Sequence, residues 1–112
     1  MLKFCNIKEN GATVEYALAR LEIEIESAKK ENAVAIKVLH GYGSHGKGGA
    51  ILNALRLSLE QWKKSKFIKN YFHGDKWGIT HKETIKIIEK DKSIFNDEDL
   101  DKNNPGITII EI

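Results

Sequence analysis

The chain has 112 residues, 41% of them hydrophobic and 30% charged, with a formal net charge of +2. This length and balance predict one folded domain, residues 1–112, and exclude a wholly disordered chain. No run approaches the roughly 20 apolar residues of a membrane span, no signal peptide is expected, and a single cysteine excludes an internal disulfide, so we expect a cytoplasmic protein.

Positive charge is concentrated in the middle of the chain. Residues 1–31 carry five basic and six acidic side chains (net −1), residues 32–90 eleven and four (net +7), and residues 91–112 two and six (net −4). A basic segment between neutral and acidic ends is typical of proteins that bind polyanions. Solvated lysines on helix faces would give the same distribution, so charge alone does not decide.

Hydrophobic periodicity predicts the element order β-α-β-α-β-α-β. The expected strands are 2–7, 33–40, 67–72 and 107–112, and the expected helices are 13–32, one that opens near Gly49, and 81–90. This order predicts an α/β fold, a two-layer α/β sandwich in which helices pack on a four-stranded mixed sheet. Residues 91–106 are acidic and rich in turn residues, which predicts a mobile loop.

Two of the expected helices carry a continuous apolar stripe. Thr13 is the expected N-cap of the first helix, and Thr80 with Glu83 predicts a capping box for the third. The stripe of the first helix is Val14, Ala17, Leu18, Leu21, Ile25 and Ala28, and that of the second is Ile51, Leu52, Leu55, Leu59 and Trp62.

The most informative stretch is "HGYGSHGKGGA", residues 40–50, which directly follows an apolar strand. A strand-to-helix turn presents backbone N–H groups and the positive end of a helix to its ligand, which favours an anion. Gly41, Gly43 and Gly46 fit a dinucleotide fingerprint, but the only acid at a suitable distance, Glu60, lies within a helical pattern.

The same stretch also fits most of a P-loop, through Gly41, Gly46 and Lys47. Gly48 stands where that motif needs Ser or Thr to bind Mg²⁺, so both nucleotide-binding interpretations are disfavoured.

Two histidines in this stretch, His40 and His45, suit proton transfer or phosphate binding near neutral pH. The alternative interpretation is a packed His40 at the strand end and a solvent-exposed His45. His73 and His81 complete the set of histidines, but together the four lack a familiar metal-ligand spacing. We therefore expect no cofactor and leave a requirement for a divalent metal open.

The motif "VLHGYGSHG" followed by "ILNALRLSL" resembles the Smr (small MutS-related) domain, whose HGxGxG motif lies on a strand-to-helix turn. His40, Gly41 and Gly43 match that motif, with Gly46 or Gly48 as its last glycine. "IKENGATVEYAL" (7–18) is similar to the family's LDLHGLTVEEAL, and "PGITIIEI" resembles its closing strand. The segments 81–90 and 91–106 are additions to this pattern.

The resemblance implies contact with DNA or RNA, because the family includes nicking endonucleases and nucleic-acid-binding domains. Family members place an Asp and a His where this chain has Lys8 and Asn10, so nucleic-acid contact is implied more directly than cleavage. If the chain cuts, the resemblance makes His40 the acid/base, loop amides the holders of the phosphate, and His45 a replacement for the missing histidine.

These considerations define the candidate residues. The catalytic candidates are His40 and His45. The phosphate-binding candidates are Gly41, Gly43, Ser44, Gly46, Lys47, Lys8, Asn10 and Arg56. The account requires unpaired amides and an outward-facing imidazole in the turn that begins at His40.

Aromatic side chains among basic ones suggest places where unpaired bases could stack. Trp77 is the best of them, ahead of Trp62, Phe67 and Tyr71, which alternate with Lys63, Lys64, Lys66 and Lys69. The expected partner is DNA or RNA and not a membrane, and no oligomeric state is predicted. Two alternatives stay open, a catalytically inactive protein-interaction or scaffold module and a binder of small phosphates.

Overall fold

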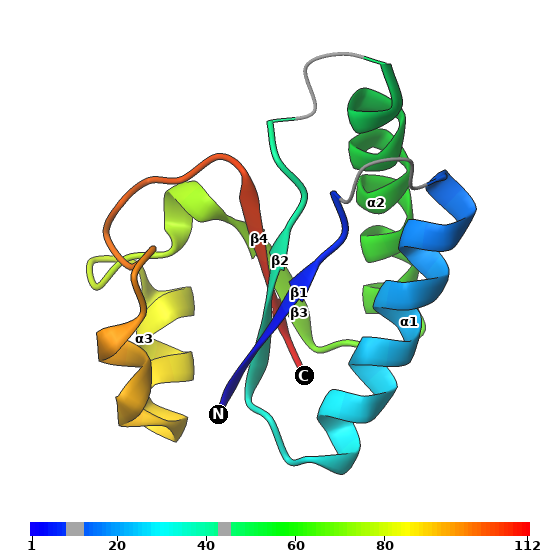
Figure 1. Cartoon of the computed structure of the whole chain (residues 1–112). Coiled ribbons are helices and arrows are strands. Elements are labelled where there is room, and N and C mark those ends of the chain that lie inside the picture. The colour runs from blue at the N-terminus through cyan, green and yellow to red at the C-terminus, as the bar shows by residue number, and fades with distance from the viewer. Residues whose placement is uncertain (9–12, 43–45) are drawn as a thin grey trace.

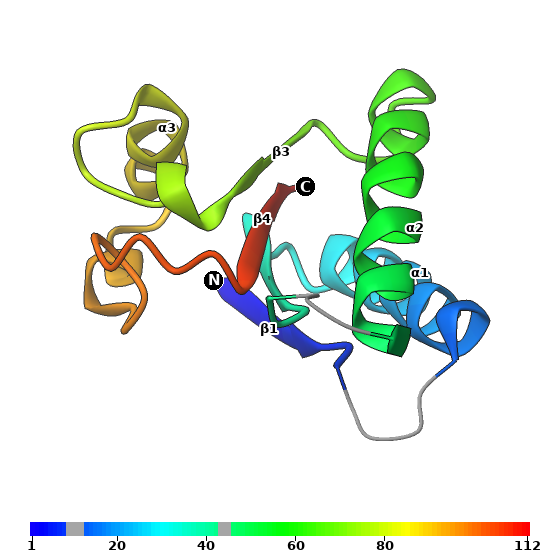
Figure 2. The ribbon, with the colours of Figure 1, turned by 90° about the horizontal axis from the view of Figure 1, so that it is seen from above.

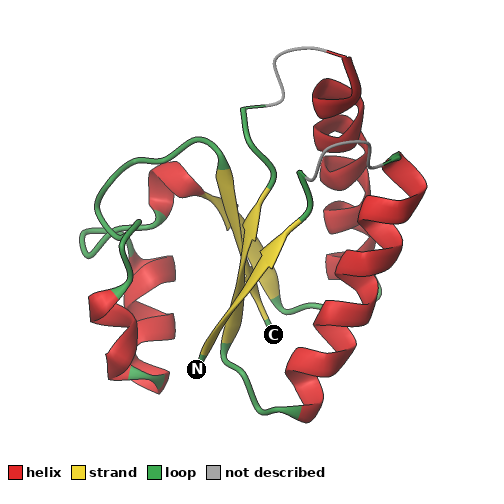
Figure 3. Cartoon of the chain, in the orientation of Figure 1, coloured by secondary structure: helices red, strands yellow, loops and turns green. Residues whose placement is uncertain are grey.

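The computed structural model describes residues 1–8, 13–42 and 46–112. The described strands are Leu2–Asn6 (β1), Ala35–Leu39 (β2), Asn70–His73 (β3) and Ile107–Glu111 (β4). The described helices are Val14–Lys30 (α1), Gly46–Lys64 (α2) and Lys82–Lys90 (α3), with short 3-10 helices at Gly74–Lys76 (η1) and Lys92–Asn96 (η2). The predicted α/β fold, a four-stranded mixed sheet with helices packed on it, is confirmed (Figure 3).

The sheet has the strand order β1-β2-β4-β3. β1 and β2 are parallel, whereas β4 runs antiparallel to both β2 and β3. The carboxyl ends of β1, β2 and β3 therefore meet the amino end of β4 at one edge. We call this the carboxyl edge, and it is marked by Asn6, Leu39, His73 and Ile107.

Helices α1 and α2 lie side by side on one face of the sheet (Figures 1 and 2). The predicted stripes face the core, with Leu21 and Ile25 of α1 and Leu55 and Leu59 of α2 fully buried. Thr13 caps α1 as predicted, because its side chain accepts a hydrogen bond from the Tyr16 N–H at 3.1 Å.

Helix α3 and the 3-10 helices cover the opposite face, on the far side of the sheet from α1 and α2 (Figure 1). A second core lies on this face, and its buried members include Phe72 and Trp77 together with Ile87 of α3 and Ile94 of η2. Alternation along the strands divides the side chains between the two cores, so that Ile109 of β4 belongs to one and Ile110 to the other.

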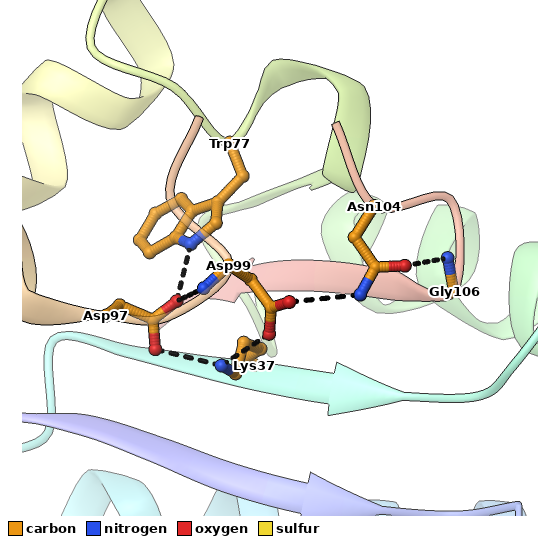
Figure 4. Close-up of polar contacts among 6 residues, drawn as sticks. All are labelled: Lys37, Trp77, Asp97, Asp99, Asn104 and Gly106. Atoms are coloured by element: carbon orange, nitrogen blue, oxygen red, sulfur yellow. Dashed lines mark hydrogen bonds and ion pairs between the residues drawn. The ribbon is translucent and has the colours of Figure 1, made fainter. Parts of the chain in front are cut away.

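A cluster of charged side chains anchors the predicted mobile loop 91–106 to the sheet (Figure 4). The buried Lys37 Nζ of β2 lies 2.8 Å from Asp97 Oδ1 and 2.7 Å from Asp99 Oδ2. The indole N–H of Trp77 donates to Asp97, and the Asn104 amide donates to Asp99. The mobility of this loop stays a prediction, and these contacts argue against it.

Two local predictions are wrong. The third helix begins at Lys82 with His81 at the N-cap position, so Thr80 and Glu83 do not form the predicted capping box. β3 begins at Asn70 and not at residue 67, because the N–H groups of Phe67 and Ile68 donate to the Trp62 carbonyl and close the end of α2.

Candidate functional site at the carboxyl edge

Topology brings several of the predicted site residues to the carboxyl edge. His40 and Gly41 follow β2, and Lys8 follows β1 just after a parallel strand pair. A Cβ on Gly41 would lie 3.4 Å from Cδ of Lys8, so the Lys8 side chain runs directly beside this glycine. Gly41 has a positive φ of 75°, a backbone conformation that favours glycine.

The His40 side chain points into the protein. Only 4% of the residue is exposed, and both ring nitrogens are engaged. Nδ1 lies 2.7 Å from the Gly41 carbonyl oxygen, and Nε2 lies 2.9 Å from the Thr108 hydroxyl. The expectation of an outward-facing imidazole at His40 is therefore not met.

The first two amides of the turn are also engaged within the fold. The N–H groups of His40 and Gly41 both donate to the Gly106 carbonyl, at 3.0 and 3.1 Å. These bonds continue the β2–β4 ladder beyond the end of the strands, which explains why the two amides are not free. Any anion held by amides here would have to use those that follow Gly41.

The environment of His40 favours its neutral form. Burial, the main influence, lowers the pKa of His40, whereas the hydrogen bond to the Gly41 carbonyl acts in the opposite direction. Electrostatic interactions with His73 and with Arg56, which lies on the exposed side of α2, lower the pKa of His40 further.

Part of the predicted site lies outside the described residues. This applies to the candidates Asn10, Gly43, Ser44 and His45. Gly46 and Lys47 are the first residues of α2, which begins earlier than the predicted start near Gly49.

The lysine cluster predicted to extend the site lies at the other end of α2. A helix of 19 residues is about 28 Å long, and Lys63 and Lys64 form its last turn. There, Lys29, Lys66 and Lys69 line an open hollow of about 420 Å³ together with Phe67. Cations at the carboxyl ends of helices are favoured by the helix dipole, which accounts for much of this cluster without a ligand.

The aromatic residues predicted to stack on bases differ in their burial. Trp77 is 1% exposed, so the prediction that it stacks on bases is wrong. Phe67 packs against Trp62 and beneath the Lys29 ammonium, and the Tyr71 hydroxyl donates to Glu60, an interaction that raises the pKa of Tyr71 to about 12.

Sequence reasoning missed two residues at the carboxyl edge. Tyr42 is 71% exposed next to Gly41, and its place within the HGxG motif was the available signal. Thr108 is fully buried between His40 and His73, with the His73 Nδ1 at 3.1 Å from its hydroxyl. No local pattern marks Thr108, because the strand pairing alone brings it to the histidines.

Among the described residues, no group of three or more His, Cys, Asp or Glu side chains is arranged to hold a metal ion. No helix in the described part of the chain combines the length and apolar composition that a bilayer crossing requires.

Comparisons with family models, curated proteins and solved structures return no match.

Proposed function

We propose that this chain is a nucleic-acid-binding domain that contacts the sugar-phosphate backbone of DNA or RNA at the carboxyl edge of its sheet. The observation that carries the proposal is the Lys8 side chain beside Gly41, next to the exposed Tyr42, with the charge of Arg56 acting on the neighbouring His40. Lysine and arginine neutralise phosphates, and an exposed aromatic ring offers a surface on which a base can stack.

The amino end of α2 adds to the positive potential of this edge. The first turn of α2 holds no acidic residue and starts where the Smr-like motif places its strand-to-helix turn. Lys8 supports the same proposal, because a cation replaces the acid that the family pattern has at this position. We place this function in the cytoplasm, where the single thiol of Cys5 is kept reduced.

Nicking of the bound strand, the activity implied by the resemblance to nicking endonucleases, requires a group that can exchange a proton at this edge. His40 is a poor candidate for that role because both of its ring nitrogens are engaged inside the fold. Binding is therefore the primary proposal, and cleavage is secondary.

The burial of His40 is the specific observation that favours the alternative, a catalytically inactive protein-interaction module. The two functions differ in their dependence on salt. Phosphate contacts by Lys8 and Arg56 alone predict that log affinity for a single strand falls with log salt with a slope of about −1.4, twice the value of about −0.7 for each contact.

Fluorescence anisotropy with labelled single-stranded DNA and RNA over a range of salt concentrations tests this. We expect binding at low salt with a slope at least that steep. Absence of binding at low salt, or a flat salt dependence, would reject the proposal in favour of the interaction module.

A further inference from the structure

Thr108 joins two histidines from neighbouring strands into one hydrogen-bonded chain. Its hydroxyl lies 2.9 Å from Nε2 of His40 and 3.1 Å from Nδ1 of His73. His73 is directly opposite Thr108 in the β3–β4 register, and Val38, two residues before His40, is opposite Thr108 in the β2–β4 register. The contacts follow from the sheet and do not depend on the turn after Gly41.

The partners determine which nitrogen carries each proton. A backbone carbonyl can only accept, so His40 must donate from Nδ1 to the Gly41 carbonyl. In neutral His40, Nε2 then accepts, and the Thr108 hydroxyl donates to it. Because that hydroxyl has one hydrogen, it can only accept from His73, which must carry a proton on Nδ1.

This arrangement leaves Nε2 of His73 with its lone pair available. His73 is exposed, and no described residue hydrogen-bonds to this nitrogen. Its ring packs at 66° to the Tyr71 ring, with the centroids 6.3 Å apart. His73 thus has the features that His40 lacks, an accessible nitrogen and a ring orientation fixed by a partner.

We propose that His73, and not His40, is the histidine that exchanges a proton with a bound phosphodiester, and that Thr108 and His40 are positioning residues for its ring. The inference rests on the proposed function, since the ligand is the nucleic acid at the carboxyl edge. In cleavage, a neutral His73 takes one proton at Nε2 from the water or ribose hydroxyl that attacks the phosphorus of the phosphodiester, and becomes an imidazolium.

The positive charge can then be shared along the chain. The Nδ1 proton of His73 moves to Thr108 Oγ1 as the hydroxyl proton of Thr108 moves to Nε2 of His40, so one proton is transferred overall and the total charge is unchanged. Burial of the His40 ring and the positive charge of Arg56 of α2 act against a protonated His40.

The tautomer of His73 tests the positioning step in the free protein. Long-range ¹H–¹⁵N spectra of the imidazole rings should show His73 as the Nδ1–H tautomer at a pH where the ring is neutral. Thr108→Val, which keeps the β-branched shape without the hydroxyl, should shift His73 toward the Nε2–H tautomer. Thr108→Ser should restore the wild-type signal. A tautomer that is unchanged in Thr108→Val would overturn the inference. Thr108→Ser is the control for a loss of stability at this position, because it changes the side chain but keeps the hydroxyl.

A second arm tests the contact with the ligand, with a single-stranded oligonucleotide as the probe. We expect the Nε2 resonance of His73 to move on addition of the oligonucleotide while that of His81, on the α3 side, stays in place. If the oligonucleotide binds and His73 does not respond, the inference fails and the proposed function stands. If no oligonucleotide binds, the proposed function fails and the role of His73 fails with it.

Discussion

Burial of the His40 ring couples the stability of this protein to pH. Because burial lowers the pKa of His40 in the folded state, the unfolded chain binds a proton at a higher pH than the folded protein does. The free energy of unfolding therefore decreases as the pH falls below the unfolded value of about 6.5, and the decrease levels off once the pH is below the folded pKa.

We predict that the wild-type free energy of unfolding rises between about pH 5 and pH 7, with a contribution from His40 of at most about 1.4 kcal/mol per pH unit. His40→Gln removes this titration, so its pH dependence should be flatter, although the variant is less stable overall. Urea unfolding at several pH values measures both. Equal slopes for wild type and variant would show that His40 is not held neutral by the fold.

The motif predicts His40 as the acting histidine, whereas His73 is the one with an accessible ring nitrogen. This difference also arises at the scale of single residues. The motif HGxG identifies His40 correctly as the residue at the end of β2. The direction of its ring depends on Thr108, which is 68 positions away in the sequence. A contact of that separation cannot be recognised from spacing within the motif.

At the scale of elements, the cluster around Lys37 attaches segment 91–106 to the sheet. Burial works to lower the pKa of Lys37, but its hydrogen bonds and charge interactions with Asp97 and Asp99 outweigh burial and raise the pKa. Burial likewise acts to raise the pKa of Asp99, and the hydrogen bonds from Lys37 and Asn104 outweigh it and lower the pKa. The interactions between Lys37 and Asp99 thus favour the charged form of both.

Removal of the cation should leave two carboxylates close together and poorly solvated. We predict that Lys37→Met lowers the free energy of unfolding by about 3 kcal/mol, the lower end of the range for breaking a buried ion pair. The matched control is Lys102→Met, which replaces an exposed lysine in segment 91–106 and should change stability by less than about 0.5 kcal/mol. Chemical denaturation measures both variants, and similar losses in the two would contradict the structural role assigned to Lys37.

Most elements were predictable because their signals are local. The stripes of α1 and α2 and the Thr13 cap depend on residues within a few turns of each other, and the structure confirms them. The role of the acidic segment 91–106 was not predictable, because its carboxylates are satisfied by Lys37, on a strand some 60 residues away. Composition alone gives such a segment the appearance of a loop.

At the scale of the whole molecule, the candidate phosphate-binding residues and the lysine-lined hollow lie apart. Lys8 lies beside Gly41 and the charge of Arg56 acts on His40, whereas Lys66 and Lys69 line the hollow beside Phe67 near the carboxyl end of α2. Residues that are near neighbours in the basic segment of the sequence thus serve different surfaces. The net charge of that segment predicts affinity for a polyanion without indicating which end of the molecule binds it.

The most direct measurement of the central claim compares two double variants that remove the same charge, one from the proposed site and one from the lysine-lined hollow. In anisotropy titrations with a labelled single-stranded oligonucleotide, Lys8→Gln/Arg56→Gln should weaken binding and reduce the steepness of the salt dependence by about 1.4 in log–log slope. Lys66→Gln/Lys69→Gln should leave the affinity and the slope close to those of wild type. The opposite ranking, with the Lys66/Lys69 variant losing affinity and the Lys8/Arg56 variant unaffected, would show that nucleic acid does not bind at the carboxyl edge.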